Sequence, residues 1–191
     1  MARPRRIDLP GQQTHVVQHG IGDARIFRDD DDMYEFLRLL GVELVRSGWT
    51  CLAYCLMSTH YHVVVQQADP SLSAGFQHLN SRYAQGFNKR HGRRGHVFEA
   101  RFRSRVVDTF EYRCEVMRYV HLNPTRALHI PPEDYPWSDY GSTIGVRPRD
   151  PLVDPAIALA PFGRDLAVAR RNYRAFVAER DPRIRRGWFQ P

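Results

Sequence analysis

Residues 55–65, CLMSTHYHVVV, join two apolar runs through a short polar link. The runs are 50–57 (TCLAYCLM) and 60–67 (HYHVVVQQ), and only Ser58 and Thr59 lie between them. A connection of two residues between apolar runs is typical of an antiparallel β-hairpin. The sequence therefore predicts two adjacent antiparallel strands, and the rest of the chain is ordered around them.

The segments on both sides of this hairpin alternate between strand and helix patterns. The predicted elements are a strand at 14–18, a helix at about 30–47, the hairpin, a helix from 71 to about 90, a strand at 96–107 and a helix at 109–123. We expect the last helix to end at Asn123, because Pro124 disfavours helical geometry in the residue before it. The order β-α-β-β-α-β-α indicates an α+β protein with an antiparallel sheet and helices packed on one face.

The chain has 191 residues, of which 42% are hydrophobic and 26% charged, as in globular proteins. After about Gly145 the composition shifts to Pro, Asp and Ala. We therefore expect one domain at 1–145 and an extension at 146–191 with one helix (164–179) and a basic tail. No apolar run approaches the roughly 18 residues of a membrane span, and no secretory signal is evident at the N-terminus. A cytoplasmic location without membrane contact is expected.

The two histidines of the hairpin are candidate metal ligands. Successive side chains of a strand point to opposite faces, so His60 and His62 project together while Tyr61 points away. Two imidazoles at this spacing can share one metal ion. A polar edge of a buried strand is the alternative interpretation.

The helix at 109–123 carries two polar residues that could complete such a site. Tyr119 and Asn123 are four apart, so they lie on one helix face about one turn from each other. Two imidazoles and an amide oxygen can hold a divalent cation, and a nearby phenol can attack a phosphodiester. Nitrogen and oxygen ligands favour Mg²⁺ or Mn²⁺. Spacing alone leaves Tyr112 open as an alternative nucleophile, because it lies on the same helix face.

The positive charge of the chain is large and clustered. The net charge is +7, and Lys89 is the only lysine among 28 basic residues, so 27 are arginine. Strand alternation predicts three guanidiniums on one face between 96 and 107. The candidate DNA contacts are Lys89, Arg90, Arg93, Arg94, Arg101, Arg103 and Arg105, with Arg3, Arg5 and Arg6 in an N-terminal arm. Such a patch suits a sugar-phosphate backbone, and a solvated charged face is the alternative.

Several separated motifs resemble the REP-associated tyrosine transposases, a branch of the single-tyrosine HUH transposases. They are RPRRIDLPG, YCLMSTHYHVVV, LNSRYAQGFNKRHGRRGHVFEARFRS, RYVHLNPTRA and EDYPWSDY, which together span most of residues 3–140. The resemblance implies a ferredoxin-like HUH fold. It also implies metal ligands at His60, His62 and Asn123, and it favours Tyr119 over Tyr112 as the nucleophile.

The resemblance further implies an activity. Members of the family bind palindromic repeat elements folded as hairpins and cut adjacent single-stranded DNA, which leaves a 5′-phosphotyrosine and a free 3′-OH. We therefore expect a bacterial, nucleoid-associated DNA endonuclease and strand transferase that acts as a monomer or homodimer. A domesticated protein that binds structured DNA or RNA with little cleavage is one alternative. A hydrolytic metallo-nuclease that uses water is another.

Overall fold

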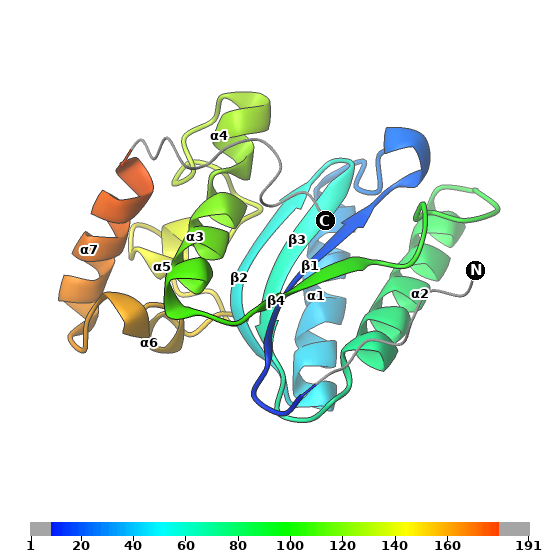
Figure 1. The fold of residues 1–191 in the computed structure, drawn as a ribbon. Coiled ribbons are helices and arrows are strands. Elements are labelled where there is room, and N and C mark those ends of the chain that lie inside the picture. The colour runs from blue at the N-terminus through cyan, green and yellow to red at the C-terminus, as the bar shows by residue number, and fades with distance from the viewer. Residues whose placement is uncertain (1–8, 180–191) are drawn as a thin grey trace.

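A four-stranded antiparallel sheet forms the centre of the computed structural model, which describes residues 9–179 (Figure 1). The strand order is β2-β3-β1-β4. The strands are β1 (Gln13–His19), β2 (Thr50–Met57), β3 (His60–Gln66) and β4 (Arg103–Val107). Neighbouring strands are antiparallel throughout. The predicted α+β fold with a ferredoxin-like β-α-β-β-α-β order is confirmed.

The predicted hairpin supplies the inner strand β3 and its edge neighbour β2. Tyr61 to Val65 are all buried, since β3 has β2 on one side, β1 on the other and helices on both faces. The sequence of a strand that is covered on both faces is continuously apolar, whereas a strand with one exposed face alternates between apolar and polar residues. This explains the three consecutive valines of the hairpin.

Helices α1 (Asp30–Ser47) and α2 (Leu72–Arg90) pack on one face of the sheet (Figure 1). α1 begins after Asp29, whose carboxylate accepts a hydrogen bond from the backbone N–H of Asp32 at 3.1 Å. It ends at Ser47, and the next residue, Gly48, caps it with a φ of +62°, which glycine reaches readily. Tyr61 of β3 packs between both helices, with its ring 4.6 Å from that of Phe36 and its hydroxyl donating to Asn80 at 2.7 Å.

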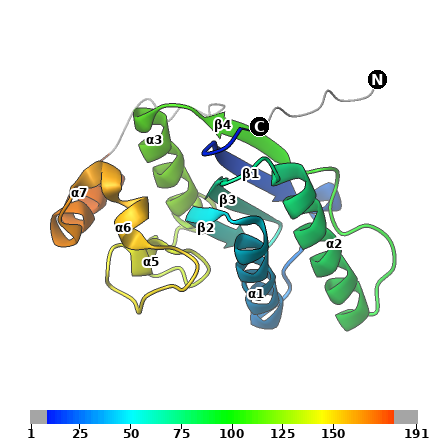
Figure 2. The ribbon, with the colours of Figure 1, turned by 90° about the horizontal axis from the view of Figure 1, so that it is seen from below.

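Helix α3 (Phe110–His121) lies on the opposite face of the sheet (Figure 2). α1 and α2 cover a single face as predicted, and α3 adds a second layer that the sequence pattern did not predict. The reason is that β2 and β3 carry buried side chains on both faces. The side chains of β3 that point away from Tyr61 are therefore enclosed beneath α3.

Two predicted boundaries differ in the structure. The strand expected at 96–107 is regular only from Arg103. The residues before it make only an isolated β-bridge, between Phe98 and Gly20, which directly follows β1. The helix expected to end at Asn123 ends at His121, and a short helix α4 (Asn123–Leu128) follows at once. A proline in the first helical turn is tolerated, since its missing N–H would have no partner there.

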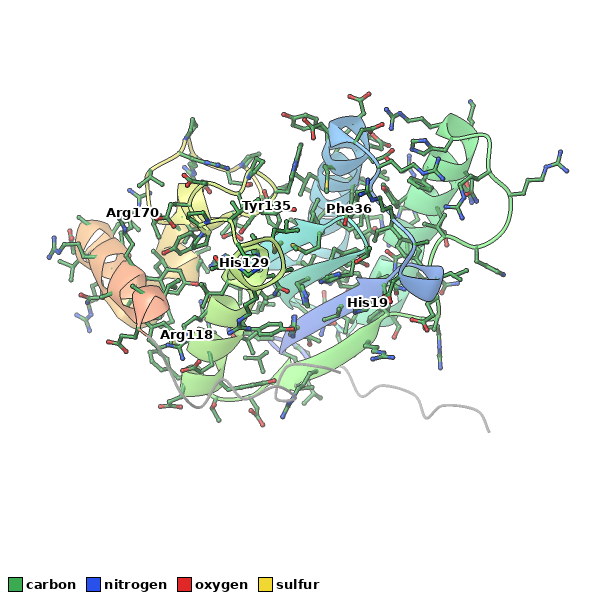
Figure 3. The ribbon with its side chains drawn as sticks, turned by 90° about the horizontal axis from the view of Figure 1, so that it is seen from above. His19, Phe36, Arg118, His129, Tyr135 and Arg170 are labelled. Carbon is green, nitrogen blue, oxygen red and sulfur yellow. The ribbon has the colours of Figure 1, made fainter. Side chains whose placement is uncertain are left out.

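The described part of the predicted extension, residues 146–179, packs beside α3. It contains α6 (Pro155–Ala158), a 3₁₀ turn at Ala160–Phe162 and α7 (Leu166–Ala178), and it follows α5 (Tyr140–Thr143). Arg118 projects from α3 toward α7 (Figure 3) and donates to the backbone oxygen of Phe176 at 3.1 Å. Its neighbour His121 is fully buried between Tyr173 and Asp139. Between residues 9 and 179, no helix has both the length and the apolar character that a membrane span requires.

Candidate metal and tyrosine site

The imidazoles of His60 and His62 both lie on the sheet face that α3 covers. Their ring centroids are 5.0 Å apart and the rings are nearly perpendicular, at 88°. Tyr61 lies on the other face against α1 and α2. The predicted arrangement of the two histidines on one face, with the tyrosine between them pointing away, is confirmed.

The Nδ1 atoms of both rings already have partners. Nδ1 of His62 lies 3.0 Å from Nε2 of His15, and Nδ1 of His60 lies 3.1 Å from the hydroxyl of Thr59. Each ring therefore has Nε2 as the nitrogen that remains for a further ligand. A neutral imidazole that donates through one nitrogen binds a metal through the other, and the partner of the first nitrogen fixes the ring.

The side-chain amide of Asn123 lies close enough to both histidines to oppose the lowering of their pKa values. The amide nitrogen donates to the backbone oxygen of Tyr119 at 2.9 Å, within the turn that joins α3 to α4. Because the amide nitrogen is used in this bond at the end of α3, the amide oxygen is the atom that faces the imidazoles. Two imidazole nitrogens and one amide oxygen thus converge, and this donor set fits a divalent cation with open coordination positions.

Burial keeps these histidines neutral. It lowers the pKa of His15 to about 3, with a smaller effect from the charge of Arg105. It also lowers the pKa of His60 to about 4 and that of His62 well below its usual value, and neighbouring histidines lower both further. The imidazoles are therefore in the uncharged form that ligates metals.

The ring of Tyr119 meets the histidines edge-on. Its centroid lies 5.4 Å from that of His62 and 6.1 Å from that of His15. The guanidinium of Arg126 lies 5.0 Å from the centre of the same ring. Burial raises the pKa of Tyr119, and the positive charge of Arg126 opposes this rise. Tyr112 instead packs its ring against Arg105, 5.0 Å from that guanidinium.

The register of β1 and β4 brings two of the predicted basic residues to this face. Arg105 pairs with His15, and Arg103 pairs with Val17. Burial lowers the pKa of His19 and the charge of Arg103 lowers it further, as the charge of Arg105 does for His15. Arg101 lies before β4 begins, so the prediction of three guanidiniums on one strand face is wrong for that residue.

The other predicted basic residues lie around the end of α2. Lys89 and Arg94 are exposed, and the guanidinium of Arg93 lies 5.5 Å from the centre of the Phe87 ring. Arg90 differs from them, because it forms ion pairs with Asp29, Asp31 and Asp32 at 2.6 to 2.8 Å. Its charge is balanced within the protein. The N-terminal Arg3, Arg5 and Arg6 lie outside the described residues.

A second cluster has donor atoms that could hold a metal, namely Asp29, Asp32 and His91. The guanidinium of Arg90 bonds to both carboxylates at 2.6 Å. Nε2 of His91 lies 2.9 Å from a carboxylate oxygen of Asp32. These contacts form an ion-pair network that joins the start of α1 to the end of α2.

Sequence reasoning missed three residues of the site, which are His15, His19 and Arg126. His15 contacts His62, and the ring of His19 stacks on that of His60 at 4.8 Å. The two missed histidines are four apart in β1, which places them on one strand face. That spacing was a usable signal, but only the register of β1 against β3 shows that this face is shared with His60 and His62.

Comparisons with known proteins identify the fold. No family model and no curated protein match the chain. The structure of a REP-associated tyrosine transposase bound to a REP hairpin aligns with a TM-score of 0.62 and 17% identity, over 81% of this chain and 93% of that chain. A candidate transposase from Deinococcus radiodurans aligns with a TM-score of 0.43 and 13% identity, over 63% of this chain and 94% of that chain. The first similarity shows that this chain has the fold of a REP-associated tyrosine transposase.

Proposed function

We propose that this protein is a metal-dependent endonuclease and strand transferase that acts on single-stranded DNA beside a hairpin. One observation carries the proposal: Tyr119, His60, His62 and Asn123 meet in a single cluster on one face of the sheet. The shared fold with a transposase that was solved with a REP hairpin supports the same class of substrate.

In this proposal His60, His62 and Asn123 hold one Mg²⁺ or Mn²⁺. A bound cation at this position supplies Lewis-acid stabilisation of the charge on the scissile phosphate. The residues around the ligands orient them: His15 and Thr59 hold the Nδ1 atoms of the two rings. The ligands are thereby placed before any cation arrives, which lowers the cost of ordering them.

Tyr119 is the proposed nucleophile. Its phenolic oxygen forms a bond to the phosphorus, the bond from phosphorus to the 3′ oxygen breaks, and the 3′ oxygen leaves as a hydroxyl after taking a proton. The product is a 5′-phosphotyrosine, which retains the phosphodiester energy for rejoining. The phenol must lose its proton, and the guanidinium of Arg126 over the ring favours the phenolate. The 3′ hydroxyl of another strand reverses the same steps during transfer.

The basic residues on the same face are proposed to hold the strand. Arg103 and Arg105 lie in β4, beside the histidine-bearing strand β1. Guanidiniums at these positions can neutralise phosphates that flank the scissile one. An unpaired strand suits this narrow site, because its backbone bends without the cost of unstacking a duplex.

The proposal is tested by trapping the covalent intermediate. The full chain is incubated with labelled single-stranded DNA that carries a repeat hairpin and with Mn²⁺, and the products are run on a denaturing gel. We expect a protein–DNA adduct that resists denaturant and disappears when a chelator is added. Cleavage without an adduct would indicate a hydrolytic nuclease, and binding without cleavage would indicate a binding protein, so either result would overturn the proposal.

His15 is expected to control the metal affinity although it is not a proposed ligand. Replacing His15 by Leu removes the partner of Nδ1 in His62, so the ring loses its fixed orientation. Loss of the hydrogen-bond partner of a metal-binding histidine reduces metal affinity by about 10- to 100-fold. Electron paramagnetic resonance of Mn²⁺ measures this, with His96→Leu at an exposed position as the control. Equal affinities in both variants would contradict the orienting role.

A further inference from the structure

A cavity of about 770 Å³ lies between α2 and residues 95–102, away from the histidine site. Residues 91–102 form the loop that runs beside α2 before the chain enters β4 (Figure 1). Gln18 of β1 also lines the cavity, and it points to the α2 face because strand alternation places it opposite to His15 and His19. This cavity therefore lies on the sheet face that α3 does not cover.

Side-chain amides and aromatic rings dominate the lining of this cavity. Its amide-bearing residues are Gln18, Gln77, Asn80, Gln85 and Asn88, and its aromatic residues include Phe98 and Phe102. The ring of Phe98 is held by Tyr61 and Tyr83, at 6.4 and 6.2 Å between centroids. The cavity wall is thus apolar around these rings and hydrogen-bonding around the amides, and one acidic and one basic side chain, Glu99 and Arg101, also line it. This composition suits a flat, uncharged ring that carries polar groups on its edge.

Two amide oxygens of the lining are buried acceptors without a hydrogen-bond donor among the described residues. Gln18 is 3% exposed, and its nitrogen donates to the backbone oxygens of Ala100 at 3.0 Å and His19 at 3.2 Å. Because those carbonyls only accept, the amide orientation is fixed and Oε1 is left as the unpaired atom. Asn88 repeats this pattern: its nitrogen donates to Gly95 at 2.8 Å, and its buried Oδ1 has no partner.

We infer that this cavity binds an unpaired nucleobase that carries an exocyclic amino group. Adenine, guanine and cytosine each present an amino group whose two N–H donors match the oxygens of Gln18 and Asn88, whereas thymine has no amino group and offers only its single N3–H. Phe98 offers an aromatic surface for the base. Arg101 is exposed at the cavity wall, where it can meet the phosphate of the same nucleotide. The inference rests on the proposed function in one respect, namely that the nucleobase belongs to DNA.

The site is tested with single nucleotides, so that neither cleavage nor a hairpin is needed. The full chain is titrated with dAMP, dGMP, dCMP and dTMP, followed by saturation-transfer NMR, with the ribonucleotides as a second series. We expect the three amino-bearing deoxynucleotides to bind and dTMP to bind at least about tenfold more weakly, because a buried acceptor stays unpaired in its complex. Equal binding of dTMP, or no binding of any deoxynucleotide, would overturn the inference. Tighter binding of the ribonucleotides would overturn the assignment to DNA.

A filling variant locates the binding to this cavity. Ser81 is exposed on α2 and lines the cavity, so Ser81→Trp is expected to fill part of it without disturbing the core and to weaken dGMP binding at least about tenfold. Ala74 is exposed on the same helix outside the lining, and Ala74→Trp is the matched control with unchanged binding. Unchanged binding in Ser81→Trp would overturn the inference. These titrations do not involve Tyr119 or a metal, so their failure leaves the proposed cleavage activity untouched, and the converse also holds.

Discussion

Replacement of Tyr119 by Phe is expected to reduce DNA cleavage by at least about a thousandfold, since loss of a nucleophile removes the covalent route altogether. DNA binding should stay within about twofold of the unchanged protein, because one hydroxyl contributes little beside the many phosphate contacts that hold a strand. The variant keeps the aromatic ring that packs against His62 and Arg126, so the fold is preserved. Single-turnover cleavage on a denaturing gel and filter binding at constant salt measure the two quantities.

Tyr112→Phe is the matched control for this prediction. Tyr112 lies two turns earlier on α3, is half-buried like Tyr119, and packs against Arg105 rather than against the histidine pair. We expect this variant to cleave DNA at a rate within about threefold of the unchanged protein, as is usual for a residue outside the reacting atoms. If Tyr112→Phe abolished cleavage while Tyr119→Phe retained it, the nucleophile would be assigned to the wrong tyrosine.

The second large effect is a loss of stability in mild acid. The buried histidines have pKa values lowered from 6.5, to about 3 for His15 and about 4 for His60, and well below the usual value for His62. Below pH 6.5 the unfolded chain takes up protons at these positions and the folded protein does not. Their contribution to stability is therefore complete above pH 6.5 and is lost progressively as the pH falls toward the folded-state pKa values.

Each such histidine contributes a slope of up to about 1.4 kcal/mol per pH unit to the free energy of unfolding. Urea unfolding between pH 7.5 and 4.5, with a chelator present, measures the summed slope. Carboxylates with lowered pKa values, such as Glu43, lower the free energy of unfolding mainly below their ordinary pKa of 4.5. The slope between pH 7.5 and 4.5 therefore comes mainly from the histidines. We expect a shallower slope in His15→Leu. A free energy of unfolding that is constant or rises on acidification would contradict the burial of neutral imidazoles.

Much of the fold follows from local patterns in the sequence. The turn at Ser58 and Thr59 defines the hairpin, and Asp29 together with Gly48 defines the ends of α1. These signals are local, because a cap or a two-residue turn depends on a few neighbouring residues. The side of the sheet on which α3 packs has no such local signal, and neither does the irregular course of residues 95–102.

The candidate site was only partly predictable for a related reason. Alternation along one strand is enough to place His60 and His62 together and Tyr61 apart. His15 comes from another strand, and its contact with His62 depends on the register of β1 against β3, which places Val17 opposite His62. Register is fixed by packing across the whole sheet rather than by either strand alone. The ion pairs of Arg90 with the start of α1 also depend on how distant segments pack, so its position in a basic run does not predict them.

The central claim is that one cation binds between His60, His62 and Asn123, within reach of Tyr119. The most direct test is a crystal of the protein soaked in Mn²⁺, with anomalous scattering recorded at the manganese absorption edge. We predict a single strong peak bounded by the Nε2 atoms of the two imidazoles and the amide oxygen of Asn123. An empty map at that position, or a peak only at Asp29, Asp32 and His91, would contradict the claim.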